Sequence, residues 1–270
     1  MKDLFVVGLI YLSAYLCIKA SEPSRDIKMF YELARNATSD SKGYVIDKIK
    51  QHRFQEMYGR CLVPHIREAR VAGRGYRFLE IGAGCALPQK KKGMQVWSAL
   101  LISTMDKIFV AELKWRCIEK MKREGTVPEN INIIIGDQGN EQDLERWGRE
   151  TGGHLDTIVD DGSHKNHHIY RSLMTLWHIV APGGLYFIED LQVSRKAAYV
   201  DTENLGKSSS TQQLFMSDVL RDFQEQLVVP SSMRGEHWRY KVLPNLKAIF
   251  CQFEACVLFK CRQNDEAKCT

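Results

Sequence analysis

The stretches HLDTIVDDGSHKNHH (residues 154–168) and APGGLYFIED (residues 181–190) decide the fold. In each, a short apolar run typical of a buried strand ends in a pair of adjacent acids. These acids are Asp160, Asp161, Glu189 and Asp190. In an open α/β sheet, ligands bind in the crevice beyond the carboxyl ends of the strands. The two acid pairs can therefore converge on one metal ion or polar substrate.

His164 follows Asp161 by three residues and could share this crevice. An imidazole titrates near neutral pH, whereas carboxylates there stay charged and can hold a cation. A single acid at a strand end is often structural. Two pairs that flank one helix are harder to explain as solvated surface, because clustering like charges costs free energy. The pattern indicates a metal or polar-substrate site with a histidine base.

Outward from these stretches, strand-like and helix-like segments alternate five times. The predicted strands are 77–81, 108–111, 131–135, 155–159 and 185–188. The predicted helices are 114–123, 143–150, 169–180 and 214–229. This alternation is typical of an α/β fold with a doubly wound, mostly parallel sheet. Two further apolar runs, 246–250 and 255–259, predict a C-terminal antiparallel strand pair.

Residues 21–75 predict a helical lead-in, because apolar and charged positions recur at helical spacing before the first strand. We expect it to pack over the sheet edge or the mouth of the substrate site. Tyr58 and His65 are candidate substrate contacts, although a core or surface role is the simpler interpretation of each. The main domain is expected to span residues 76–262, with a tail at 263–270.

The segment 1–20 predicts a signal peptide or signal anchor, because its apolar run is too short for a comfortable membrane span. A buried first helix is the alternative. We expect the secretory pathway, either the ER or Golgi lumen or secretion, with membrane contact only through this segment if it is uncleaved. The sequon Asn36-Ala37-Thr38 would then be usable for glycosylation.

Eight cysteines occur, and seven would remain after cleavage, so at least one would be unpaired. Cysteines crowd the C-terminus at positions 251, 256, 261 and 269. A terminal disulfide and buried free thiols both explain them, and connectivity does not follow from spacing. The absence of any C-x-x-C pair argues against a cysteine zinc site.

The formal net charge is +5, and the main basic run is Lys90-Lys91-Lys92. A nucleic-acid-binding protein would more often show a clustered basic stripe with stacking aromatics. No nucleic acid partner is therefore expected.

A glycine loop, Gly82-Ala83-Gly84, follows the first strand, where glycines let the backbone approach a cofactor. A G-x-G pattern alone is weak evidence for a cofactor-binding loop. A dinucleotide fingerprint would need a third glycine where Leu87 stands, so a nicotinamide cofactor is disfavoured. Glu80, just before the loop, could accept hydrogen bonds from the loop amides or from a ligand ammonium.

Polar side chains also follow the second and third strands. Glu112 could accept both hydroxyls of a ribose, although a solvated acid at a helix start is the alternative. Asp137 and Gln138 could address an adenine edge.

The motifs FLEIGAGC, VAE, IIIGDQ, IVDDGSH and APGGLYFIED, in this order, resemble a class I S-adenosylmethionine-dependent methyltransferase with its Rossmann-like fold. In particular, DDGSH with IED resembles the metal-dependent sugar O-methyltransferases of the macrocin and mycinamicin type, and the related cephalosporin-hydroxylase-like group. The resemblance runs from about Tyr44 to the last strands. After Cys85 the chain departs from it, since Pro88–Gly93 carries Lys90-Lys91-Lys92 where relatives have a glycine-rich loop of small residues, so substrate contacts there are not carried over.

The resemblance implies transfer of a methyl group from S-adenosylmethionine to a hydroxyl of a sugar or glycoside. It implies a divalent cation, usually Mg²⁺, bound by Asp161, Glu189 and Asp190, with His164 as the base and Asp161 as the second catalytic residue. The implied cofactor-binding residues are Glu80, Gly82, Gly84, Glu112, Asp137, Gln138 and Asp160. A homo-oligomer is also implied, since relatives often form multimers.

Two alternatives remain open. One keeps the metal site for hydroxylase-like chemistry, which would need an iron-type set of two histidines and one carboxylate. The other is a non-catalytic methyltransferase-fold binding module of the secretory pathway.

Overall fold

The computed structural model describes residues 23–39, 45–85, 92–200, 213–230, 233 and 238–263. The predicted signal segment lies outside the described residues. So do Lys90 and Lys91, residues 201–212, and the tail beyond residue 263.

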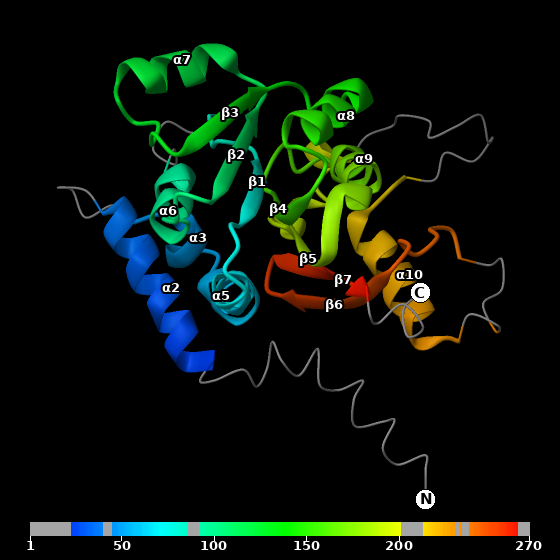
Figure 1. The fold of residues 1–270 in the computed structure, drawn as a ribbon. Helices are drawn as coiled ribbons and strands as arrows, with labels where there is room; N and C mark the ends of the chain where they lie inside the picture. Colours follow the sequence, from blue (N-terminus) through cyan, green and yellow to red (C-terminus); the bar gives the residue numbers. More distant parts are fainter. Residues whose placement is uncertain are drawn as a thin grey trace, which may run out of the picture.

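Within the described residues, one seven-stranded sheet forms the centre, in the order β3-β2-β1-β4-β5-β7-β6 (Figure 1). Its strands are β1 (Arg77–Ile81), β2 (Lys107–Glu112), β3 (Ile131–Ile135), β4 (Leu155–Asp160), β5 (Val180–Ile188), β6 (Leu246–Gln252) and β7 (Ala255–Lys260). Strands β1 to β5 pair in parallel, and β7 is antiparallel to both β5 and β6. The predicted fold class is therefore confirmed.

Helices cover both faces of the sheet (Figure 1). One layer contains α2 (Pro23–Thr38), α3 (Asp47–Lys50), α4 (Gln55–Met57), a π-helix (Tyr58–Leu62), α5 (Val63–Val71), α6 (Gly93–Leu100) and α7 (Trp115–Arg123). The other contains α8 (Glu141–Glu150), α9 (Asn166–Leu176) and α10 (Met216–Val228). Short 3₁₀ segments lie at Trp177–Ile179, Leu191–Val193 and Ala197–Tyr199. This is the two-sided covering expected of a parallel sheet.

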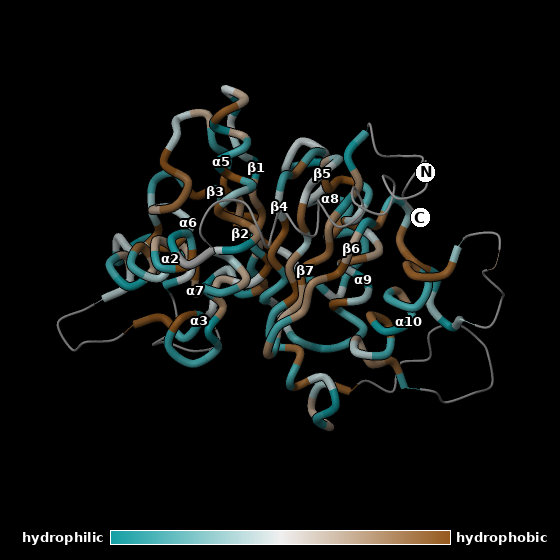
Figure 2. Tube along the Cα trace, turned by 90° about the horizontal axis from the view of Figure 1, so that it is seen from below, coloured by the Kyte–Doolittle hydropathy of each residue, from teal (hydrophilic) through white to brown (hydrophobic). Residues whose placement is uncertain are grey.

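Neighbouring residues along the central strands point into opposite cores, because side chains alternate across a strand. Phe78 and Phe187 pack with the lead-in helices, whereas Leu79 and Tyr186 pack under α8, α9 and α10. Figure 2 shows the hydrophobic stretches gathered in the strands at the centre.

The lead-in helices belong to the same core as the sheet. Tyr58 is fully buried, and its ring centroid lies 5.1 Å from that of Phe30, 5.2 Å from Trp97 and 4.9 Å from Phe187. Such close aromatic contacts stabilise beyond the area they bury. The N-terminal segment is therefore anchored beside the strand ends. No helix among the described residues is both long enough and apolar enough to cross a bilayer.

Two elements differ from the sequence prediction. Helix α6 was not among the predicted helices; it begins at Gly93, and Lys92 before it supplies no side-chain cap. Strand β5 begins at Val180 rather than at Leu185, so Pro182–Gly184 lies inside it. A register shift in the β4–β5 pairing accommodates this stretch.

The β6–β7 hairpin is closed by a disulfide between Cys251 and Cys256, one of the pairings left open by the sequence. Cys61 is buried in the lead-in core.

Candidate active site

A cavity of about 280 Å³ lies beyond the carboxyl ends of the parallel strands. Predicted site residues that line it are Glu80, Gly82, Gly84, Glu112, Asp137, Gln138, Asp161, His164 and Asp190. Two other predicted site residues, Asp160 and Glu189, are each only 1% exposed and do not line it. A cavity of this size at this edge of the sheet is typical of small-molecule sites.

Glycine is required at position 82 because two loops meet there. Gly82 has a φ of 98°, and an added Cβ would lie 2.2 Å from the carbonyl oxygen of Asp161. A side chain at this position would push the β1 loop away from the β4 loop. The glycine therefore brings the predicted cofactor loop directly beside the predicted catalytic acid.

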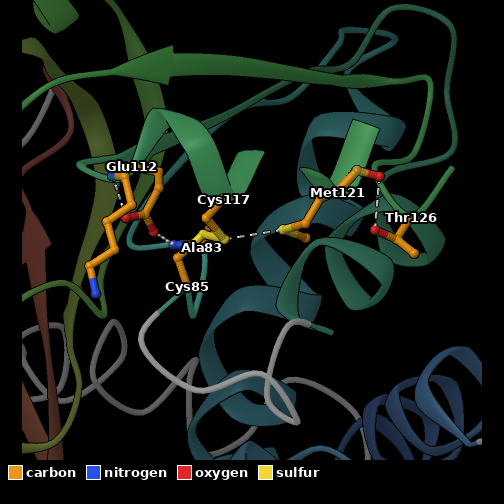
Figure 3. The surroundings of a disulfide bond; sticks show 7 residues. Ala83, Cys85, Glu112, Cys117, Met121 and Thr126 are labelled. Atoms are coloured by element: carbon orange, nitrogen blue, oxygen red, sulfur yellow. Dashed lines mark hydrogen bonds between the residues drawn. A yellow bond between two sulfur atoms is a disulfide. The ribbon is translucent and has the colours of Figure 1, made fainter. Parts of the chain in front are cut away.

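Glu112 holds the glycine loop in place (Figure 3). Its Oε2 accepts a hydrogen bond from the amide of Ala83 at 3.0 Å, and its Oε1 accepts one from the amide of Lys114 at 2.9 Å. A disulfide between Cys85 and Cys117 joins the same loop to α7. This disulfide was not predicted, because the spacing of the two cysteines carries no signal. Each Glu112 oxygen keeps a second lone pair, so ribose binding stays a prediction.

Gln138 and Asp160 form a buried network behind the cavity wall. The Gln138 amide donates to both carboxylate oxygens of Asp160, at 2.7 and 2.9 Å, and accepts from the amide of Ser163 at 2.9 Å. The hydroxyls of Ser172 and Tyr186 also donate to Asp160. The structure therefore places Asp160 as an anchor for the loop after β4 rather than on the cavity surface, and the amide of Gln138 is occupied within this network.

Asp161, His164 and Asp190 converge at one end of the cavity. Nε2 of His164 lies 3.3 Å from Oδ2 of Asp190 and 4.0 Å from Oδ1 of Asp161. One ligand atom from each of the three lies within 4.8 Å of the others. His164 and Asp190 both have a φ of 57°, a left-handed backbone that non-glycine residues rarely adopt and that concentrates at functional sites.

Asp190 also faces a second imidazole, which the sequence did not reveal. Nδ1 of His52 lies 3.7 Å from Oδ1 of Asp190 and is hydrogen-bonded to Glu254 in the β6–β7 turn. These three side chains form a second group able to hold a metal ion. Asp190 thus lies between two histidines from distant parts of the chain.

The predicted metal ligands fit a hard divalent cation in part. Asp161 and Asp190 present carboxylate oxygens to the cavity, the ligand type that Mg²⁺ prefers. Glu189 is buried, and its carboxylate accepts hydrogen bonds from Lys48 and Tyr58. Glu189 can join such a site through the lone pairs that these two donors leave.

Lys48, in helix α3 of the lead-in, was missed by the sequence reasoning. Its Nζ donates to Oδ2 of Asp161 at 2.7 Å and to Glu189, and lies 3.5 Å from Oε1 of Glu80. Burial lowers the pKa of Lys48, but Asp161 and Glu189 raise it by more, so the net pKa is well above its usual value and the ammonium stays charged. Burial raises the pKa of Glu80 to about 7, against the opposing effect of Lys48.

The two candidate contacts in the lead-in have different surroundings. Tyr58 is a core residue whose hydroxyl donates to Glu189. His65 is hydrogen-bonded to the hydroxyl of Tyr76 at 2.6 Å and does not line the cavity. Burial lowers the pKa of His65 to about 4.

No known family model matches the chain. It is 33% identical over 149 residues to mycinamicin VI 2''-O-methyltransferase of Micromonospora griseorubida, covering 52% of this chain and 32% of that protein. It is 32% identical over 107 residues to demethylmacrocin O-methyltransferase of Streptomyces fradiae, covering 40% of this chain and 27% of that protein. The matches thus span about a third or less of these relatives.

Solved structures of the methyltransferase MycE from the mycinamycin biosynthetic pathway are similar to this chain. One, in complex with Mg and SAH, has a TM-score of 0.60 at 23% identity over 88% of this chain and 55% of MycE. Another, which also holds mycinamycin VI, has a TM-score of 0.61 at 22% identity over the same shares. The likeness shows that this chain has the Rossmann-like fold of that methyltransferase.

Proposed function

We propose that this protein transfers a methyl group from S-adenosylmethionine to a hydroxyl of a sugar or glycoside with the help of a divalent cation. One observation carries the proposal: a single cavity joins the Gly82–Gly84 loop and Glu112 to the group Asp161, His164 and Asp190. The relatives are named as sugar O-methyltransferases, and the MycE structures hold Mg and SAH, the product form of this cofactor.

The cofactor would lie along the strand ends. The glycine loop would bring backbone amides close to it, and Glu112, which lines the cavity at the end of β2, would bind the ribose hydroxyls. Glu80 lies beneath the loop, and its Oε2 has no hydrogen-bond partner among the described residues. A buried carboxylate oxygen without a donor fits the cationic amino group of the methionine portion.

Asp161 and Asp190, with Glu189 behind them, would hold the cation. When bound, a divalent cation would orient a vicinal diol of the acceptor and lower the pKa of the attacking hydroxyl. The same acids orient His164, which lies within 4.0 Å of both Asp161 and Asp190.

The proposed reaction needs one base. The acceptor oxygen forms a bond to the methyl carbon while the bond between that carbon and sulfur breaks. The electron pair of the broken bond stays on sulfur, which gives S-adenosylhomocysteine. The imidazole of His164 accepts the hydroxyl proton. Holding donor and acceptor in line supplies much of the acceleration expected for such a transfer.

We also propose a secretory compartment for this chemistry. The pairs Cys85–Cys117 and Cys251–Cys256 support it, because disulfides persist in oxidising surroundings. Asn36 of the sequon is exposed on α2.

The test begins with calorimetric binding of S-adenosylmethionine, with and without Mg²⁺, followed by methyl transfer to a panel of glycosides. His164→Ala should lower turnover by about 10²–10⁴-fold with nearly unchanged cofactor affinity, because the imidazole accepts the hydroxyl proton and does not bind the cofactor. The exposed His178 supplies the control, His178→Ala, which should behave as wild type. A folded protein that binds no S-adenosylmethionine would exclude the proposal and favour a non-catalytic module.

A further inference from the structure

Three acids from three different strand ends lie together at the cavity: Glu80 and Asp161 line it, and Glu189 lies behind them. Glu80 and Glu189 are each 1% exposed, and the side chain of Asp161 is 25% exposed. Three carboxylates this close and this little exposed repel one another strongly, because the low dielectric of the protein interior screens their charges poorly. The sheet alone would not hold them together.

Lys48 is the cation that faces all three. Its side chain is 6% exposed, and its Nζ touches Asp161 and Glu189 and lies 3.5 Å from Glu80. The aliphatic stem brings the ammonium to 5.8 Å from the ring of Trp97. Because Lys48 also lines the cavity, it lies between the predicted cofactor side and the predicted metal side.

The contacts of Asp161 and Glu189 differ. Oδ2 of Asp161 accepts a hydrogen bond from Lys48, and its Oδ1 lies 4.0 Å from Nε2 of His164. This one carboxylate therefore links the buried acids to the group of Asp161, His164 and Asp190. Glu189 is held from one side by Lys48 and from the other by Tyr58. Both lead-in side chains therefore fix carboxylates on which the proposed cation would depend.

We propose that Lys48 is a positioning residue: its ammonium is the built-in counter-charge that keeps Asp161, Glu189 and Glu80 together, and it shares Asp161 and Glu189 with the divalent cation. This inference rests on the proposed function. It assigns the N-terminal lead-in a direct part in the site. Without the ammonium, the cluster depends on the divalent cation for its charge balance.

The experiment compares Lys48→Met with wild type by thermal melting in EDTA and in Mg²⁺, and measures Mg²⁺ affinity by calorimetry. In EDTA the variant should melt at least about 6 °C lower, because an acid cluster loses its only close cation among the described residues. Mg²⁺ should then raise its melting temperature by more than it raises that of wild type, and should bind about tenfold more tightly. A merely structural lysine would lower the melting temperature without changing the response to Mg²⁺.

Lys260→Met is the matched control. Lys260 is also partly buried, but its Nζ donates to the carbonyls of Trp177 and Val180 at the opposite end of the sheet. This variant should lose stability equally in EDTA and in Mg²⁺.

A second variant keeps the test decisive if Lys48→Met yields little folded protein. Lys48→Met combined with Glu80→Gln removes one negative charge from the cluster and should recover stability in EDTA relative to Lys48→Met alone. No recovery, or a Mg²⁺ response no larger than that of wild type, would overturn the counter-charge role. Wild type that binds no Mg²⁺ would instead remove the metal from the proposed function, and the EDTA comparison would still test Lys48.

Discussion

The disulfide between Cys85 and Cys117 should contribute more to stability than the one between Cys251 and Cys256. The first pair is separated by 32 residues and the second by 5. In the chain-entropy description, these loops correspond to about 3.7 and about 2 kcal/mol. For a chain of this size, the losses translate into melting temperatures lower by roughly 7–15 °C and 4–8 °C.

The assay is thermal melting of two double variants, Cys85→Ser with Cys117→Ser and Cys251→Ser with Cys256→Ser. The first should also weaken S-adenosylmethionine binding by about three- to tenfold, because the glycine loop loses its covalent tie to α7 and must be ordered on binding. The second should leave that affinity unchanged, since its hairpin lies outside the cavity. Equal losses of stability, or equal cofactor affinities, would refute this reasoning.

Three further substitutions have defined outcomes. Gly82→Ala should lower the free energy of unfolding by about 2 kcal/mol or more, because the added Cβ would collide with backbone atoms. Gly125→Ala is the control, since Gly125 also has a positive φ but no atom lies within 4 Å of an added Cβ. Equal denaturation midpoints for the two variants would contradict the clash. Glu112→Gln should weaken cofactor binding about tenfold or more in calorimetry, because the amide replaces a charged acceptor of ribose and loop hydrogen bonds; an unchanged dissociation constant would argue against that role. For His65, the folded pKa of about 4 lies below the usual 6.5, so its contribution to stability is full above pH 6.5 and is lost as the pH falls toward 4. This loss amounts to as much as about 3 kcal/mol, and His65→Gln should flatten the decline in urea titrations between these pH values.

Much of the fold was predictable because it depends on local patterns. Each parallel strand is a short apolar run, and most are followed by a helical span, so their alternation identifies the sheet. The site acids were found for the same reason, since Asp161 directly follows β4 and Asp190 lies two residues beyond the end of β5. Parallel strands place such residues at one edge whatever the loops do.

The remaining parts depend on contacts between distant segments. Lys48 is one of several charged residues in the lead-in, and nothing in its neighbourhood distinguishes it from the exposed Lys50. The resemblance implied a cofactor role for Asp160, whereas its carboxylate accepts hydrogen bonds from Gln138, Ser172 and Tyr186, partners that come from other parts of the chain and leave no local pattern. The partner of Cys85 likewise follows only from the folded positions of β1 and α7.

The ion pair between Lys48 and Glu189 joins residues 141 positions apart. We expect contacts this far apart to form late in folding, because the chain must first lose the entropy of closing a long loop. A refolding chain can build its strands and helices from nearby segments, but its acids stay without their ammonium until the N-terminal helices dock. The order of assembly thus separates the appearance of secondary structure from the appearance of a competent site.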